Sequence, residues 1–134
     1  MRTLGQERAE YALNKVLEIK NLSKEYKSFT AGTPTVILQN GFGQAMAFWL
    51  SKGEEKHKFV FNSIKGWLIK KDFIKLEPEN TENNIDAKFI LKLSKISQKD
   101  YLAAQKEALL FLEWVKRYTS AFCKGEKDNN SEKK

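Results

Sequence analysis

The most regular hydrophobic pattern in the chain runs from Ser97 to Cys123, a stretch with no Gly and no Pro. Its first apolar set recurs at a spacing of about 3.6 residues, which places it on one face of a helix. That set is Tyr101, Ala104, Ala108, Phe111, Leu112, Val115, Tyr118 and Phe122. A second set, about a third of a turn away, is Ala103, Leu110, Trp114 and Ala121. We therefore predict a long C-terminal helix that is covered on two sides. It is either the centre of an all-helical domain or a core helix that also meets a partner.

The ends of this helix are marked in the sequence as well. The Ser97 side chain can accept a hydrogen bond from a free backbone amide of the first turn, and Asp100 follows three residues later. Ile96 and Tyr101 stand at the positions of a hydrophobic staple across that cap. Gly125 follows the last periodic residue and suits a helix end.

Apolar residues at helical spacing predict further helices upstream. A first helix is expected from Thr3 to about Ser28. The sequence Thr30-Ala31-Gly32-Thr33-Pro34 is expected to break it, with Thr33 and Pro34 as the cap and first turn of the next helix. The remaining helices are expected at residues 35–53, 55–71 and 86–94, with a loop around Pro78.

Some short stretches leave the local structure open. The runs at residues 36–38 and 89–93 are apolar enough for buried strands, although their surroundings favour helix. The sequence Asn40-Gly41-Phe42-Gly43 is either a kink in a helix or a place where two backbones approach closely, and we expect a weak point at Gly41. The same stretch imitates a dinucleotide-binding Gly-x-Gly fingerprint, but Met46 occupies the third small position and no strand–helix alternation follows. A helix kink packed against a neighbour is the better interpretation.

The composition is that of a folded domain with a basic surface. Of the 134 residues, 41% are hydrophobic, including 9 Phe and 3 Trp, which is enough for a substantial core. We predict one domain, a compact bundle of about five to six helices at residues 1–123, followed by a disordered polar tail at residues 124–134. The formal net charge is +7, and the tail contributes only one of those charges. This balance indicates a polyanionic partner such as nucleic acid, or else a lysine-rich solvated surface.

Few side chains offer catalytic or metal-binding chemistry. Cys123 is the only cysteine and His57 the only histidine, so an intrachain disulfide is impossible and a zinc site would lack its usual thiolates. His57 lies on an apolar helical face, as core histidines do, and the sequence around Cys123 contains nothing that would activate a thiol. The 17 acidic residues form no metal-ligand motif. We predict no catalytic residue, no metal, no cofactor and no enzymatic activity.

The apolar runs also bear on location. None approaches the roughly 18 residues that would span a bilayer. The N-terminal sequence MRTLGQERAEYAL has no apolar signal core. We expect a cytoplasmic protein without membrane contact that is a monomer when isolated.

Lysines at helical spacing form two lines of positive charge. The first is Lys20, Lys24 and Lys27, the second is Lys88, Lys92, Lys95 and Lys99, and Lys116 and Arg117 lie further along the last helix. Such lines suit contacts with phosphates rather than base reading, and a solvated helix face is the alternative. Most aromatic residues fit core faces, so base stacking and sequence-specific readout are not expected. The residues expected to contact RNA phosphates are Lys20, Lys24, Lys27, Lys92, Lys95 and Lys99.

Three segments, in this order, resemble the small helical subunit of the type III-B CRISPR effector, the Cmr complex. They are LGQERAEYAL at residues 4–13, QNGFGQAMAFWLSK at residues 39–52 and YLAAQKEALLFLEWVKRY at residues 101–118. The second and third segments are the more specific ones, and residues 53–84 match in character only. The resemblance extends from Leu4 to Phe122.

The resemblance implies an all-helical, non-catalytic protein in a filament of small subunits that runs beside the subunits carrying the guide RNA. That filament would help hold the guide–target RNA duplex by its phosphates. The implied partners are the backbone and large Cmr subunits, neighbouring copies of the chain, guide RNA and target RNA. Target cleavage would belong to the backbone subunits, and cyclase and DNA-cutting chemistry to the large subunit. The apolar set that contains Leu110 and Trp114 would then contact a neighbouring subunit.

Two other functions remain compatible with the residues. A free-standing helical adaptor would bind a protein through Leu110 and Trp114, and its charge would be incidental. A small single-stranded nucleic-acid binder acting alone would bind tightly as an isolated chain, with a strong dependence on salt.

Overall fold

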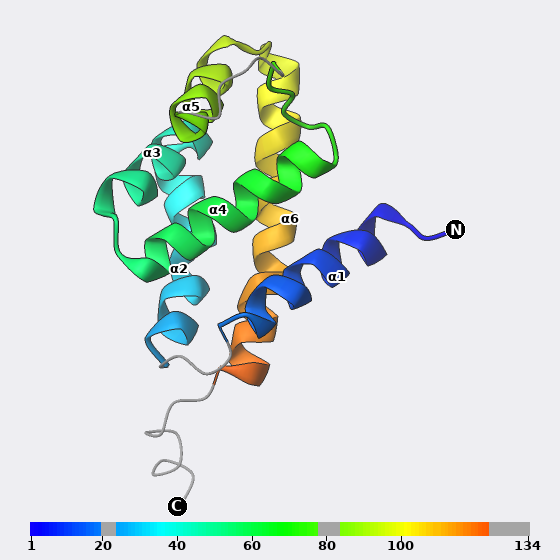
Figure 1. Ribbon diagram of the computed structural model, residues 1–134, viewed down its shortest axis with the longest axis vertical. Helices are drawn as coiled ribbons and strands as arrows, with labels where there is room; N and C mark the ends of the chain where they lie inside the picture. Colours follow the sequence, from blue (N-terminus) through cyan, green and yellow to red (C-terminus); the bar gives the residue numbers. More distant parts are fainter. Residues whose placement is uncertain (20–23, 78–83, 124–134) are drawn as a thin grey trace, which may run out of the picture. The chain divides into compact units, whose positions relative to one another are not determined.

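The computed structural model describes residues 1–19, 24–77 and 84–123, and every regular element among them is an α-helix (Figure 1). The helices are α1 (Leu4–Leu17), α2 (Lys24–Asn40), α3 (Phe42–Lys52), α4 (Glu55–Lys70), α5 (Ile85–Lys95) and α6 (Gln98–Phe122). The predicted all-α class and long C-terminal helix are confirmed, since α6 has 25 residues. The two runs that also fitted strands lie inside α2 and α5.

The chain separates into two compact units, which are described in turn. The first comprises Met1–Val36 and Leu109–Lys134, and the second comprises Ile37–Ala108. Helices α2 and α6 contribute residues to both. The extent of a single domain over residues 1–123 stays a prediction. The tail at residues 124–134 and the helix stop at Gly125 lie outside the described residues.

In the first unit, α1 and α2 pack against the C-terminal half of α6. Helix α1 begins with a capping box in which Thr3 and Gln6 satisfy each other's backbone amides. The ring centroid of Tyr11 on α1 lies 5.9 Å from that of Phe111 on α6. The buried hydroxyls of Thr30 on α2 and Thr119 on α6 are hydrogen-bonded at 2.7 Å. This part of α6 thus holds α1 by an aromatic contact and α2 by a polar one.

In the second unit, the N-terminal half of α6 contacts α3 and α4. The indole Nε1 of Trp67 donates a hydrogen bond to Glu107 Oε2 at 2.7 Å, and both side chains are buried. The backbone amide of Phe42 donates to Gln105 Oε1 at 3.2 Å, which satisfies a free amide at the start of α3. Burial of the Glu107 carboxylate is tolerable because the indole N–H compensates part of its lost hydration.

The predicted start of α6 is confirmed. The Ser97 hydroxyl accepts a hydrogen bond from the Asp100 amide at 3.1 Å, and the Ser97 carbonyl accepts one from the Tyr101 amide at 2.9 Å. Ser97 is therefore the N-cap that the sequence indicates, because its side chain takes an amide that has no partner within the helix.

The first predicted helix is too long. Helix α1 ends at Leu17, where the Glu18 amide bonds to the carbonyls of Lys15 and Val16, and α2 begins at Lys24. The continuous helix expected from Thr3 to Ser28 is therefore wrong. Apolar periodicity continues across the interruption because α1 and α2 both bury residues in the same unit, and a hydrophobic pattern reports burial rather than chain continuity.

The break predicted at residues 30–34 is also wrong, because α2 passes through Pro34. Proline has no N–H and leaves the carbonyl of Thr30, four residues earlier, without its helical donor. The Thr33 hydroxyl donates to that carbonyl at 2.9 Å. A side chain thus replaces the missing backbone donor, and the buried contact between Thr30 and Thr119 holds this turn against α6.

The weak point expected at Gly41 is a junction between two helices. Gly41 has φ 92° and ψ 154°, a region that essentially only glycine occupies, and it separates α2 from α3. Two residues later, the Gly43 amide donates to the Tyr101 hydroxyl at 2.7 Å, and a Cβ on Gly43 would lie 3.3 Å from that oxygen. The Asn40–Gly43 stretch is a helix junction closed onto α6, in agreement with the expected packing against a neighbour.

We expect Gly41→Ala to lower the free energy of unfolding by roughly 1–3 kcal/mol, because alanine would be held in a strained backbone conformation. Gly43→Ala should cost less than Gly41→Ala, since the helix preference of alanine offsets part of the loss that arises when the Tyr101 hydroxyl shifts and its hydrogen bond weakens. Gly32→Ala is the matched control, because the new Cβ meets nothing within 4 Å and alanine favours a helix. Urea unfolding followed by circular dichroism measures all three variants. Equal losses at Gly32 and Gly41 would contradict this account.

Candidate nucleic-acid interface

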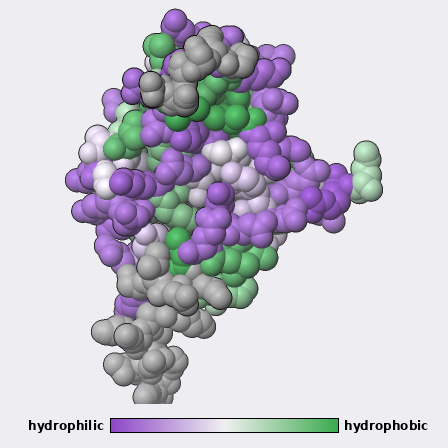
Figure 2. Space-filling view, viewed as in Figure 1, coloured by the Kyte–Doolittle hydropathy of each residue, from purple (hydrophilic) through white to green (hydrophobic). Residues whose placement is uncertain are grey.

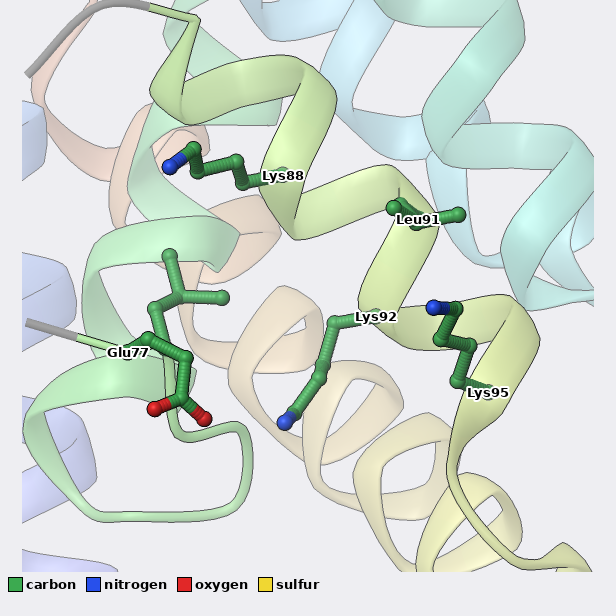
Figure 3. Close-up of a pocket in the computed structure, with 6 residues that line it drawn as sticks. Glu77, Lys88, Leu91, Lys92 and Lys95 are labelled. Carbon is green, nitrogen blue, oxygen red and sulfur yellow. The ribbon is translucent and has the colours of Figure 1, made fainter. Parts of the chain in front are cut away.

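Three lysines of α5 gather around one hollow of the second unit. The hollow has a volume of about 320 Å³ and is lined by Leu76, Glu77, Lys88, Leu91, Lys92 and Lys95. The lysines occupy positions i, i+4 and i+7 of the helix, so they share one face. Figure 3 shows their side chains extending from α5 around the hollow. The line of charge predicted on this helix is thus a cluster on a concave surface.

Lys92 also borders a second hollow of about 520 Å³. Its lining residues are Asp72, Phe73, Lys75, Lys92, Ile96, Asp100 and Ala103. Lys75 adds an exposed cation that periodicity missed, because it lies in the irregular segment after α4. Lys99, by contrast, lines neither hollow and is exposed in the first turn of α6. The structure therefore divides the predicted stripe into a cluster on α5 and a separate lysine on α6.

The lysines of the structure differ in their ion pairing. Within residues 1–19, 24–77 and 84–123, no carboxylate forms an ion pair with Lys92, Lys95 or Lys99. Elsewhere such pairs do form: Lys65 is paired with Asp86, and Lys116 lies 3.5 Å from Glu113. Uncompensated lysines beside a hollow attract an anion more strongly than paired ones.

The first predicted stripe is only partly described. Lys24 is exposed and Lys27 half-buried in the first turn of α2, and Lys20 lies outside the described residues. Lys24 and Lys27 lie within one turn of α2, so the described part of this stripe keeps its helical spacing.

The second apolar set of α6 is exposed in the first unit. Leu110 is 40% exposed and Trp114 is 38% exposed, and the Trp114 ring stacks on Tyr118 with centroids 5.5 Å apart. Phe122, which was expected on the core face, is 45% exposed, and its ring centroid lies 6.4 Å from that of Tyr118. The expectation that Phe122 lies on the core face is therefore wrong. We call Leu110, Trp114, Tyr118 and Phe122 the α6 outer face. Figure 2 shows hydrophobic areas within the mainly hydrophilic face that it presents.

His57 and Cys123 are both buried. The His57 ring meets Phe48 edge-on at 6.3 Å, and its Nδ1 lies 3.5 Å from Glu54 Oε1, as suits a histidine packed in a core. The Cys123 thiol points to the carbonyl of Ile19 at 3.7 Å, and burial raises its pKa. A raised pKa leaves the thiol protonated at neutral pH, which is the opposite of what an activated nucleophile requires.

In the part of the chain that the structure describes, no three His, Cys, Asp or Glu side chains are grouped so that they could hold a metal ion. None of the helices described is both long enough and apolar enough to cross a bilayer.

Residues 4–122 match the family model described as CRISPR-associated protein (Cas_Cmr5). The chain belongs to the Cmr5 family. It is 31% identical over 123 residues to the CRISPR system Cmr subunit Cmr5 of Thermus thermophilus, with 90% of this chain and 96% of the relative covered. It also resembles the crystal structure of a Cmr5-family protein from the same organism, with a TM-score of 0.70 and 27% identity. That comparison covers 91% of this chain and 98% of the other.

The family assignment confirms the resemblance drawn from three sequence segments. The two more specific segments contain the helix junction around Gly41 and the central part of α6, which are joined in the structure by the bond from Gly43 to Tyr101. The lysines contributed little to the resemblance, because helical spacing of lysine is common on solvated surfaces.

Because Cys123 is buried, we expect its thiol to react slowly and the stability of this Cmr5-family protein to depend on pH. Because burial raises the thiol pKa above its ordinary value of 9.0, the unfolded chain loses this proton at lower pH than the folded chain does. The contribution of the protonated Cys123 thiol to stability is therefore fully present below about pH 9. The free energy of unfolding should fall as the pH rises beyond that value. Alkylation of the native protein at about pH 8 should be slow compared with alkylation in urea.

Two measurements check this expectation. Urea titrations across the alkaline range should give a steeper fall in stability for the wild type than for Cys123→Ser, which has no thiol to titrate. The pKa of Tyr11 is also raised, by burial and by Glu18. Tyr11 therefore changes the pH dependence of stability only above its ordinary pKa of 10.0, and the absorbance of the tyrosinate distinguishes its ionisation from that of the thiol. Rapid alkylation of the native thiol would contradict the buried position.

Proposed function

We propose that this chain is a non-catalytic small subunit of a type III-B CRISPR Cmr effector complex that acts in the cytoplasm. In this proposal, copies of the chain stand next to one another in a filament beside the backbone and large Cmr subunits. The filament helps hold the duplex of guide RNA and target RNA through contacts with phosphates. The isolated chain is a monomer, and its function depends on assembly.

The observation that carries the proposal is the match to the Cmr5 family over residues 4–122. Because the match runs from the start of α1 to the end of α6, it includes every described helix. The Thermus thermophilus relative is named as a subunit of the Cmr system, and this chain covers nearly all of that relative. A role within the same kind of assembly is therefore the simplest functional inference.

Charge supports the RNA-facing part of the proposal. Lys92 and Lys95 line a hollow of the second unit, and Lys99 stands exposed nearby in sequence on α6. In the first unit, Lys24 and Lys27 share one turn of α2, and Lys20 precedes them in the sequence. Lysine ammonium groups contact phosphates as point charges without reading bases, which suits a duplex whose sequence differs from one guide to the next.

The α6 outer face supports the subunit-contact part. Large apolar side chains at the centre of an interface carry much of its binding energy, and tryptophan and tyrosine are enriched there. Leu110 and Trp114 leave a large apolar area in water, and Trp114 is held by its stack on Tyr118. A neighbouring subunit would cover this face.

Neutralising three lysines of the second line of positive charge tests the RNA contact. We expect Lys92→Gln, Lys95→Gln and Lys99→Gln together to weaken RNA binding by the assembled complex. The slope of log K against log salt is negative, and its magnitude should decrease by about 2–3, because each lost phosphate contact contributes about 0.7–0.9 to that magnitude. Titrations of the reconstituted complex with labelled target RNA at about 50 and about 200 mM salt measure this slope.

A matched triple variant separates a specific contact from a general loss of charge. Lys58→Gln, Lys70→Gln and Lys106→Gln remove the same charge from exposed positions of the same unit, outside both hollows. The control should retain most of the binding. If both triples lose equal affinity, the charge of the protein rather than the stripe is responsible, and the proposed contact fails.

Changes on the α6 outer face test assembly. We expect Leu110→Ser with Trp114→Ser to weaken incorporation into the complex by at least about 2 kcal/mol, roughly thirtyfold in Kd, because both remove apolar area from an interface centre. Leu102→Ser is the control, since Leu102 is also exposed on α6 but belongs to the second unit. Co-purification and sedimentation with the other Cmr subunits measure incorporation, and circular dichroism checks folding. Normal incorporation of the folded double variant would remove this face from the proposed contacts.

The two alternative functions give different outcomes in these experiments. A helical adaptor would respond to Leu110 and Trp114 and ignore the lysines. A free-standing single-stranded nucleic-acid binder would bind RNA tightly and with strong salt dependence before any partner is added. Weak binding alone that rises on assembly supports the proposed subunit role.

A further inference from the structure

The hollow beside α5 has features that a line of phosphate contacts does not require. Besides the lysines, its wall contains Leu76 and Leu91, and Leu91 is 53% exposed although it is a large apolar residue. A volume of about 320 Å³ lies at the small end of ligand-binding pockets in proteins. The site therefore combines an apolar surface, several cations and enough space for a small ligand.

The charges of the hollow are arranged asymmetrically. Lys92 and Lys95 extend from α5, and the Glu77 carboxylate lies across from them, as Figure 3 shows. An anionic group is attracted to the lysines and repelled by Glu77, whereas a hydrogen-bond donor is attracted to Glu77. The preferred ligand thus has an anion at one end, a donor at the other and an apolar body between them.

We propose that this hollow binds one unpaired nucleotide, with its phosphate at Lys92 and Lys95, its base against Leu91 and Leu76, and a base N–H group donating to Glu77. The inference goes beyond phosphate contact because it assigns a subsite for the base. It depends on the proposed function only for the source of the nucleotide, which is either an RNA strand or a free nucleoside monophosphate. Among the pyrimidines, cytosine suits Glu77 better than uracil, since carboxylates accept from its exocyclic amine.

Other anions fit the hollow less well. The phosphates of a continuous duplex would place negative charge near Glu77 and would leave the two leucines unused. An acidic peptide would also be repelled by Glu77, because its carboxylates are not confined to one end. A nucleotide satisfies the cations, the apolar wall and the carboxylate together.

Titration of the full-length isotope-labelled chain with cytidine monophosphate, uridine monophosphate and inorganic phosphate tests the proposal by NMR. Amide shifts should concentrate at Leu76, Glu77, Leu91 and Lys92. Cytidine monophosphate should bind at least about threefold more tightly than uridine monophosphate and about tenfold more tightly than phosphate, since uracil lacks the amine and phosphate lacks the base. Equal affinity for all three ligands would overturn the base subsite.

Two variants and one control assign the contacts. Lys95→Gln should weaken cytidine monophosphate binding at least about threefold, whereas Lys106→Gln should change it less than about twofold, because Lys106 is also an exposed lysine of the same unit but does not line the hollow. Glu77→Gln should reduce the preference for cytidine over uridine monophosphate. Equal losses at Lys95 and Lys106 would mean that only long-range attraction acts, and the proposal would fail.

The source of the nucleotide is decided by comparing short RNA strands. If the source is an RNA strand, an oligocytidylate should give the same shifts at higher affinity than cytidine monophosphate, and Lys95→Gln should weaken it. If the source is a free nucleotide, the oligocytidylate should bind no better than the monophosphate. A fully paired duplex that alone shifts these residues would overturn the subsite while leaving the proposed RNA contact intact. Conversely, nucleotide binding without any effect of the lysines on the assembled complex would leave the subsite standing and remove the RNA contact from the proposed function.

Discussion

The structure depends on one constraint, which is that α6 must bury apolar residues along a helix of 25 residues. Because α6 has no Gly or Pro at which it could kink, other helices have to cover it, α1 and α2 in the first unit and α3 and α4 in the second. Polar groups set the register of this packing. Trp67 bonds to Glu107 and Gly43 to Tyr101, and a buried donor that lost its acceptor would destabilise the fold, whereas non-directional apolar contacts tolerate small shifts.

The surfaces of functional interest are formed by residues of α5 and α6 that do not pack in the core. Core packing uses only part of α6 and one face of α5, so Leu110 and Trp114 on α6 and the lysines on α5 stand at the surface. Leu110 and Trp114 belong to the first unit, and the α5 lysines belong to the second. For the proposed function, the helices serve as a rigid support, and binding belongs to side chains that folding does not use.

Much of the fold could be read from the pattern of residues because it is local. Helical class, the Ser97 cap, the buried face of α6 and the special role of Gly41 follow from periodicity, capping and backbone freedom. Local signals failed where other contacts overrode them: Pro34 stays inside α2 because Thr33 and α6 compensate for it. The hydrophobic pattern does not show the interruption after Leu17 because both flanking helices bury apolar residues.

The candidate sites divide in the same way. The sequence by itself determined that the chain is helical, basic and a member of the Cmr5 family, since these properties depend on residue types and their spacing. It also placed three lysines on one face of α5. Only the tertiary structure decided that Glu77, Leu76 and Lys75, from an irregular segment, line hollows with those lysines, and that Lys99 does not. Spacing along a helix fixes neighbours within that helix, whereas a hollow is made by segments that only folding brings together.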